Sequence, residues 1–122
     1  MTLGSRRRQQ DWALHAYRQV AEVPQGKRNE YRITVNDLGA NVLRTGLAGA
    51  VAVLEREEKR GGGLVLTHLA AASIAGLVPA TGSDLGARVR GLGLDEYMIA
   101  TREVLQVATW LRRAVQATFD EG

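Results

Sequence analysis

The stretch "LDEYMIATREVLQVATWLRRAVQATF", residues 94–119, predicts the longest helix of the chain. Its apolar residues recur every three or four positions, which is the spacing of one helix face. We therefore expect a helix from about Asp95 to Phe119. Its apolar stripe consists of Leu94, Tyr97, Met98, Thr101, Val104, Leu105, Ala108, Leu111, Val115 and Phe119.

A helical wheel separates the remaining residues of this segment. At about 100° per residue, Arg102 and Arg113 fall on the face opposite the stripe. Trp110 falls there too, and Arg112 falls near the edge of the stripe. A large apolar side chain on an outer face indicates a contact with a partner, unless the helix packs on two sides and buries it. Both interpretations of Trp110 stay open from the sequence.

The rest of the chain divides into helical segments separated by clear stop signals. Pro24, Pro79 and the glycines at 61–63 end helices. The expected helices span about 5–23 with Ser5 as N-cap, 28–43, 45–60 with Thr45 as a cap, and 64–78 as a central buried helix.

A glycine-rich stretch over residues 81–93 predicts a loop that holds at most a short helix, capped by Ser83 or Asp84. "YRITV" at 31–35 is the best strand candidate, but an isolated strand has nothing to pair with. The sequence therefore predicts an all-α protein. We expect a single compact bundle of about five to six helices over residues 1–122, with 1–5 as a flexible arm.

Composition sets limits on the partners and on the chemistry. The formal net charge is +3, and all basic residues except Lys27 and Lys59 are arginines. This mild surplus permits an anionic partner without requiring one. The absence of cysteine excludes disulfides, thiolate catalysis and cysteine zinc sites. The start lacks the apolar core of a signal peptide, and the apolar part of the charge-free run 61–83 is short for a membrane span. A cytoplasmic protein is expected.

No arrangement of residues indicates catalysis. The two histidines, His15 and His68, stand on a polar face and inside an apolar run, with no acidic motif beside them. We expect His68 to be a core residue with one hydrogen bond. Asp11, His15, Arg18 and Glu22 are spaced to pair along one face of the first helix. The glutamates at 55, 57 and 58 alternate with basic residues, which is typical of a solvated face. We therefore predict no enzyme, no metal and no cofactor.

Three stretches together resemble the small subunit of type III-B (Cmr) CRISPR effector complexes. The run "YMIATREVLQVATWLRRAVQAT", residues 97–118, is similar to the C-terminal helix of that family. The matching positions are Tyr97, Thr101, Glu103, Trp110, Leu111, Arg112, Arg113 and Ala114. "RTGLAGAVAVLE" shares the Gly-Leu pair at Gly46 and Leu47, with Thr45 where asparagine is usual. "DWALHAYRQV" resembles the opening helix. The type III-A small subunit is a related alternative.

The resemblance implies a non-catalytic helical subunit in RNA-guided antiviral defence. Such a subunit stacks along the backbone subunit of the complex and lies beside the guide RNA and target RNA. Base pairing by the guide supplies the sequence specificity, so the protein would contact phosphates without reading bases. Charge and helix faces select the expected RNA-contacting residues as Arg18, Lys27, Arg28, Arg44, Arg102, Arg112 and Arg113, with Trp110 at a partner interface.

Two alternatives from other classes remain. One is a structural helical protein that self-associates through Trp110 and its glycine-rich faces. The other is a small helical DNA-binding regulator, for which "VNDLGANVLRTG" at 35–46 would form a helix-turn-helix.

Overall fold

The computed structural model describes residues 3–119, with side chains from Arg7 onward, and this part of the chain is helical without a strand. The all-α prediction is therefore confirmed. The helices are α1 (Leu3–Ala21), α2 (Arg28–Arg56), α3 (Gly62–Ala70), α4 (Leu85–Arg90) and α5 (Leu94–Thr118), and the short 3₁₀ turns are η1 (Gln25–Lys27) and η2 (Glu58–Arg60).

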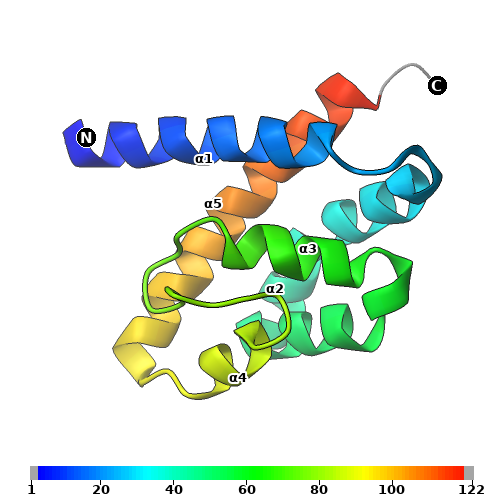
Figure 1. Ribbon diagram of the computed structural model, residues 1–122. Coiled ribbons are helices and arrows are strands. Elements are labelled where there is room, and N and C mark those ends of the chain that lie inside the picture. The colour runs from blue at the N-terminus through cyan, green and yellow to red at the C-terminus, as the bar shows by residue number, and fades with distance from the viewer. Residues whose placement is uncertain (1–2, 120–122) are drawn as a thin grey trace.

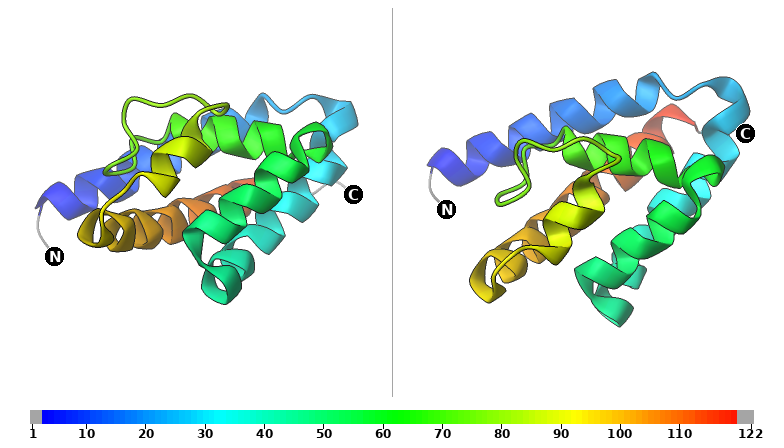
Figure 2. Two further views of the ribbon diagram at one scale, coloured as in Figure 1. Left: turned by 90° about the horizontal axis from the view of Figure 1, so that it is seen from below. Right: turned by 60° about the horizontal axis from the view of Figure 1, so that its bottom comes forward.

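Helix α5 packs against both α1 and α2. Figure 1 shows α1 crossing over it, while α2 runs along it on another side. Helices α3 and α4 pack against α2 and complete the bundle (Figure 2). Contacts on two sides explain why the buried face of α5 is wider than one stripe: Ala100, Val107 and Ala114 are buried along with Val104 and Leu111. Leu94 and Met98 were expected in the core, but 75% and 54% of their surfaces are exposed.

Helix α1 begins before the expected cap. Ser5 lies inside the helix, so its prediction as N-cap is wrong. Residues 3–5 of the expected flexible arm belong to α1, and residues 1–2 lie outside the described residues. Trp12, Ala16, Val20 and Val23 recur at helical spacing and are buried, whereas Tyr17 is 42% exposed.

The two helices expected over 28–60 form one helix with a kink. Gly46 has φ +82° and ψ 167°, so α2 changes direction there and continues to Arg56. This left-handed φ suits glycine because other residues place a Cβ in conflict with the backbone. Tyr97 of α5 fixes the kink, since its hydroxyl accepts the Ala48 N–H at 2.9 Å. Residues 35–45 are continuous helix, so the helix-turn-helix considered for this run is not formed.

The apolar character of α2 follows from its place in the core. By length and composition alone, Gln25–Arg56 would also suit a membrane-crossing helix. Tyr31, Leu38, Leu47 and Leu54 of this helix are instead buried within the bundle, whereas Ile33 and Leu43 are exposed. Core helices of water-soluble bundles meet the same criterion.

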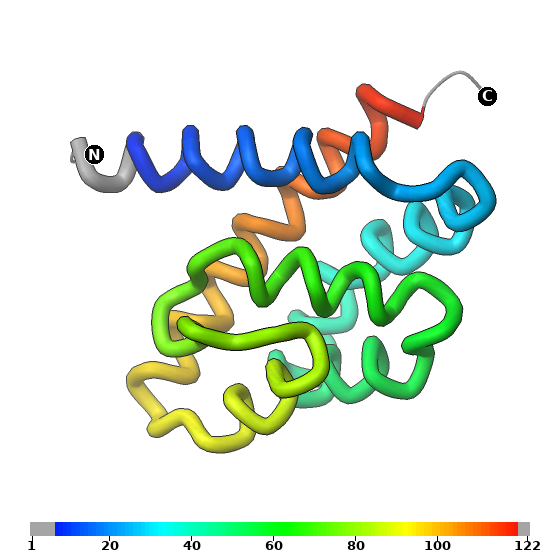
Figure 3. The backbone as a smooth tube through the Cα atoms, viewed as in Figure 1, coloured from blue at the N-terminus to red at the C-terminus, as the bar shows by residue number. Residues whose placement is uncertain are grey.

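The predicted central helix 64–78 is wrong in length. Helix α3 ends at Ala70, and residues 71–84 form the long loop visible in Figure 3. The loop is held by groups distant in sequence. The Trp12 indole N–H donates to the Ala72 carbonyl, and the Ala75 N–H donates to the Glu103 carboxylate, both at 2.9 Å. Ile74 and Leu77 of this loop are buried in the core. The loop therefore has the apolar composition of a core helix although it is not helical.

The short helix in the glycine-rich segment is confirmed as α4, and Asp84 is its N-cap residue. The Asp84 carboxylate accepts the Thr81 N–H at 2.6 Å, which closes the turn before the helix. Hydrogen bonding from Thr81 holds the pKa of Asp84 below its usual value.

Candidate nucleic-acid interface

Helix α5 presents an outer face between its contacts with α1 and α2. Arg102, Thr109 and Arg113 are exposed along this face, spaced by seven and four residues. Residues at these spacings lie on one side of a helix, so the two arginines project from the same surface. We call Arg102, Thr109, Arg113 and the adjoining Gln116 the outer face of α5.

The outer face carries positive charge that is not neutralised locally. The single acidic residue between Tyr97 and Thr118 is Glu103, which points toward α1. Its carboxylate pairs with the Arg8 guanidinium and accepts the Ala75 N–H. Within the described residues, no carboxylate pairs with Arg102 or Arg113. The face is therefore available to an anionic partner.

Trp110 lies beside the outer face and contacts α1. Its indole N–H donates to Gln9 Oε1 at 2.7 Å, and Gln9 Nε2–H donates to Gln106 Oε1, also at 2.7 Å. The Arg113 guanidinium lies 4.9 Å from the centre of the indole ring. Trp110 is thus half-buried between α1 and α5, and it supports Arg113 by a cation–π contact. Packing on two sides, one of the two interpretations of the sequence, accounts for its position.

Arg112 lies on a different side of α5 from Arg113. It lines a groove of about 340 Å³ between α5 and the first half of α2. We call this the α2/α5 groove; it is lined by Asn36, Gly39 and Leu43 of α2 and by Leu105, Thr109 and Arg112 of α5, among others.

The other expected RNA-contacting residues are spread over several elements. Arg18 is exposed on α1. Arg44 is exposed on α2, and its guanidinium donates to Asn41 Oδ1. Lys27 donates to the Lys59 carbonyl at 3.3 Å and lies 4.0 Å from the Glu30 carboxylate. These residues thus lie on α1, η1 and α2 rather than on α5.

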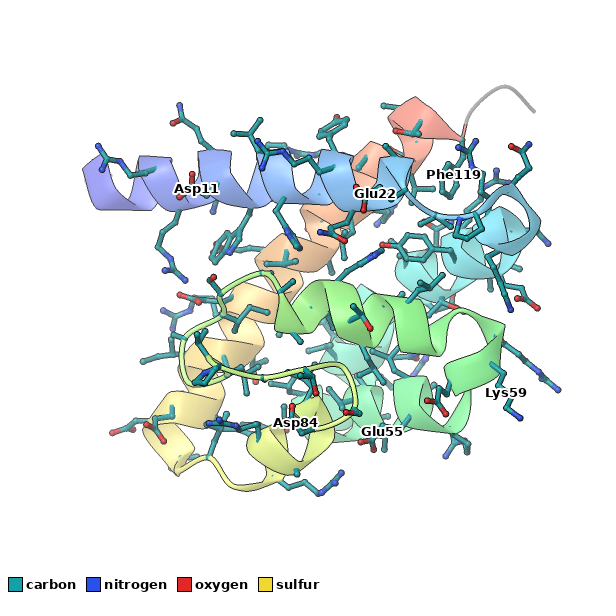
Figure 4. The ribbon with its side chains drawn as sticks, in the orientation of Figure 1. Asp11, Glu22, Glu55, Lys59, Asp84 and Phe119 are labelled. Atoms are coloured by element: carbon teal, nitrogen blue, oxygen red, sulfur yellow. The ribbon has the colours of Figure 1, made fainter. Side chains whose placement is uncertain are left out.

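The end of α5 holds another pair of arginines. The Arg28 guanidinium lies 4.7 Å from the centre of the Phe119 ring, and Phe119 lies beside the start of α2 (Figure 4). Arg32, which the sequence analysis did not select, donates to the Phe119 carbonyl at 3.1 Å. Basic side chains commonly bond the free carbonyls at helix C-termini. Arg32 therefore ties the end of α5 to α2, and the Arg28 guanidinium packs on the Phe119 ring beside it.

The two histidines lie close together, His68 in the core and His15 half-buried beside it. His68 is 5% exposed, and its Nδ1 lies 2.7 Å from the Tyr31 hydroxyl, which confirms the expected buried histidine. His15 Nε2–H donates to the His68 carbonyl at 2.9 Å, so the expected surface pairing of His15 with neighbouring acids on α1 is wrong. Burial, and to a smaller extent the charge of His15, lowers the pKa of His68 to about 4. Burial also raises the pKa of Tyr31.

A separate cleft lies between α3 and residues 80–83. It measures about 740 Å³ and is lined by Leu66, Ala70, Glu55 and Glu58, among others. Glu55 pairs with Arg90 at 3.4 Å. No group of three His, Cys, Asp or Glu side chains suited to a metal ion occurs in residues 3–119.

Comparison with known proteins identifies the family. The family described as CRISPR-associated protein (Cas_Cmr5) matches residues 8–118. The chain belongs to the Cmr5 family. A relative named CRISPR system Cmr subunit Cmr5, from Thermus thermophilus, is 33% identical over 117 residues, which cover 95% of this chain and 99% of the relative.

A solved structure agrees with this assignment. The crystal structure of a CRISPR-associated Cmr5 family protein from Thermus thermophilus superposes with a TM-score of 0.77 at 32% identity, and the match covers 90% of this chain and 96% of that one. Cmr5 is the small subunit of the type III-B Cmr complex, so the predicted family and its place in CRISPR antiviral defence are confirmed.

Proposed function

We propose that this Cmr5-family chain is a non-catalytic, cytoplasmic subunit that contacts guide and target RNA through phosphates, and that the outer face of α5 makes the principal contacts. The observation that carries the proposal is the pair of exposed arginines, Arg102 and Arg113, on one helix face without a neighbouring acid in the described residues. Guanidinium groups bind phosphate oxygens with two parallel hydrogen bonds.

The surroundings of the two arginines favour backbone contact over base recognition. Thr109 and Gln116 add hydrogen-bonding groups of the kind that contact phosphates and sugars. The one large aromatic ring nearby, Trp110, is half-buried beneath Arg113 and bonded to Gln9, so it is not presented as a stacking platform. Its proposed part in an interface is to hold Arg113 in place. Arg18, Lys27, Arg28 and Arg44 are proposed as secondary contacts.

The paired variant Arg102→Ala/Arg113→Ala is expected to weaken incorporation into the Cmr complex in a salt-dependent manner. Each lost phosphate contact lowers the slope of log affinity against log salt by about 0.7–0.9. Removing both arginines should therefore lower the slope by about 1.5. The measurement titrates the protein into the remaining Cmr subunits assembled on guide RNA with target RNA, at several salt concentrations.

The matched control is Arg56→Ala/Arg88→Ala, which removes the same charge from exposed positions on α2 and α4. It should reproduce the salt slope of the unchanged protein. If the two double variants give the same slope, long-range charge explains the effect and the phosphate contacts at the outer face are disproved.

A further inference from the structure

The α2/α5 groove contains a glycine that the fold itself does not need. Gly39 lies within helical backbone in the middle of α2, and a Cβ placed on it would meet nothing within 4 Å. Glycine inside a helix costs about 1 kcal/mol relative to alanine. At Gly62 and Gly82, by contrast, backbone atoms of other segments fill the space that a side chain would occupy. The missing side chain at Gly39 keeps the groove open to the outside.

The walls of the groove expose apolar surface. Leu43 is 76% exposed, and Leu105 and Ala108 lie across from it on α5. Met98 and Leu94, which are 54% and 75% exposed, continue the line of Leu105 toward the start of α5 at helical spacing. Exposed leucines and methionine in one line mark a protein contact more than an RNA contact, because phosphate recognition uses polar groups.

The shape of the groove suits a helix. The first half of α2 and α5 run antiparallel, since Arg32 bonds to Phe119 at one end and Gly46 lies against Tyr97 at the other. A third helix laid between two antiparallel helices extends the bundle, and small residues let its backbone approach closely. The α5 wall from Met98 to Arg112 rises about 21 Å at 1.5 Å per residue, which accommodates about four helical turns.

The charge of the groove indicates the kind of helix. Arg112 is the one charged residue among those that line it, and no acidic side chain lines it within residues 3–119. The whole chain carries +3, so a second copy would bring further positive charge toward Arg112. Charge complementarity therefore favours an acidic partner over another copy.

We propose that the α2/α5 groove receives an amphipathic helix, apolar on one face and flanked by acidic residues, from a different protein subunit of the Cmr complex. Its apolar side chains would pack over Gly39 and against Leu43 and Leu105, and a carboxylate would pair with Arg112. This assignment separates Arg112 from the RNA contacts expected from sequence: Arg113 faces RNA, and Arg112 faces protein. It rests on the proposed role as a Cmr subunit.

Site-specific crosslinking tests the occupant of the groove directly. The chain has no cysteine, so Leu43→Cys supplies a single thiol for a benzophenone label. In the complete complex, irradiation is expected to crosslink this position to another Cmr protein subunit, at a segment that is helical and acidic. Gly26→Cys, on η1, is the reference position. Crosslinks from residue 43 to RNA or to a second copy of this chain, or none above the Gly26→Cys level, would overturn the proposal.

A filled groove provides the second test. Gly39→Gln places a side chain in the open space without a clash, so the fold should be retained, as circular dichroism and thermal unfolding would verify. We expect its incorporation into the complex to weaken by about tenfold or more, as for the loss of a central interface contact. Gly26→Gln, where a Cβ also meets nothing within 4 Å, should match the unchanged protein.

The two proposals can fail separately. Suppose that Gly39→Gln incorporates into the complex normally, while Arg102→Ala/Arg113→Ala lowers the slope of log affinity against log salt. The groove proposal is then wrong and the RNA proposal stands. If Arg102→Ala/Arg113→Ala instead gives the same salt slope as Arg56→Ala/Arg88→Ala, while Leu43→Cys crosslinks to an acidic helix, the RNA proposal is wrong and the groove proposal stands.

Discussion

Gly62→Ala is expected to lower the free energy of unfolding by about 3 kcal/mol, because two backbone oxygens already occupy the space for a methyl group. A Cβ on Gly62 would lie 2.2 Å from the Leu54 carbonyl oxygen and 2.8 Å from that of Glu57. Neither oxygen can rotate away as a side chain would. The turn from α2 through η2 into α3 would have to open. Urea unfolding followed by circular dichroism measures the loss.

Gly39→Ala is the matched control for this prediction, since it adds the same methyl group within a helix but into open space. It should leave stability unchanged or raise it by about 0.5–1 kcal/mol, the helix propensity difference between the two residues. Equal effects at Gly39 and Gly62 would mean that the close approach of α2 to the start of α3 does not limit stability.

The second large effect is a loss of stability in mild acid through His68. Its pKa is about 4 in the folded protein and 6.5 for an unperturbed histidine, so the unfolded chain binds the proton more readily. Lowering the pH from about 6.5 to 4 therefore favours unfolding, and the contribution is fully retained above 6.5. The difference corresponds to about 3 kcal/mol at 1.36 kcal/mol per pKa unit. Urea midpoints measured across this range test it.

A double variant isolates the contribution of His68 from those of the carboxylates. Tyr31→Phe/His68→Leu removes both partners of the buried hydrogen bond, which leaves no unpaired polar group and so costs little by itself. The pH dependence between 6.5 and 4 should become shallower than in the unchanged protein. Parallel curves for the two proteins would show that His68 does not resist protonation in the fold.

The helical content and the main breaks could be predicted because they depend on local signals. Pro24 ends the first helix region, and Asp84 stands at the N-cap position of the short helix α4. Gly46 marks the change of direction in α2 where a break was expected. The family was recognised from the C-terminal helix. Such features follow from the backbone preferences of single residues and from apolar spacing along one helix.

The structural predictions that were wrong share a different cause, which is contact between parts of the chain that are distant in sequence. Residues 71–78 were expected to be helix because they are mostly apolar, but they belong to a loop in which Trp12 of α1 and Glu103 of α5 bond to backbone groups. Likewise, no sequence pattern predicts that the Gln9 side chain bonds both Gln106 and Trp110. Local patterns do not contain these pairings.

The same limit applies to the candidate site. The wheel separated Arg113 from Arg112 correctly by face, yet it could not show that Arg112 borders a groove formed with α2. The sequence likewise did not predict that Arg8 pairs with Glu103. This pairing leaves no acidic residue on the outer face of α5 between Tyr97 and Thr118 in the described structure.

The kink at Gly46 divides α2 into two halves, so a change in the backbone angles of this one residue would rotate one half relative to the other. The arm from Gly46 back to Arg28 is about 27 Å long at 1.5 Å per residue. A rotation of about 10° in the backbone at Gly46 would therefore displace the Arg28 end by about 5 Å. The second half carries Glu55 against Arg90 of α4, while the first half forms one wall of the α2/α5 groove. The torsion angles of Gly46, which lies beside the Tyr97 hydroxyl, thus set the width of a groove that follows α2 from Leu43 to Val35, about three helical turns from the kink.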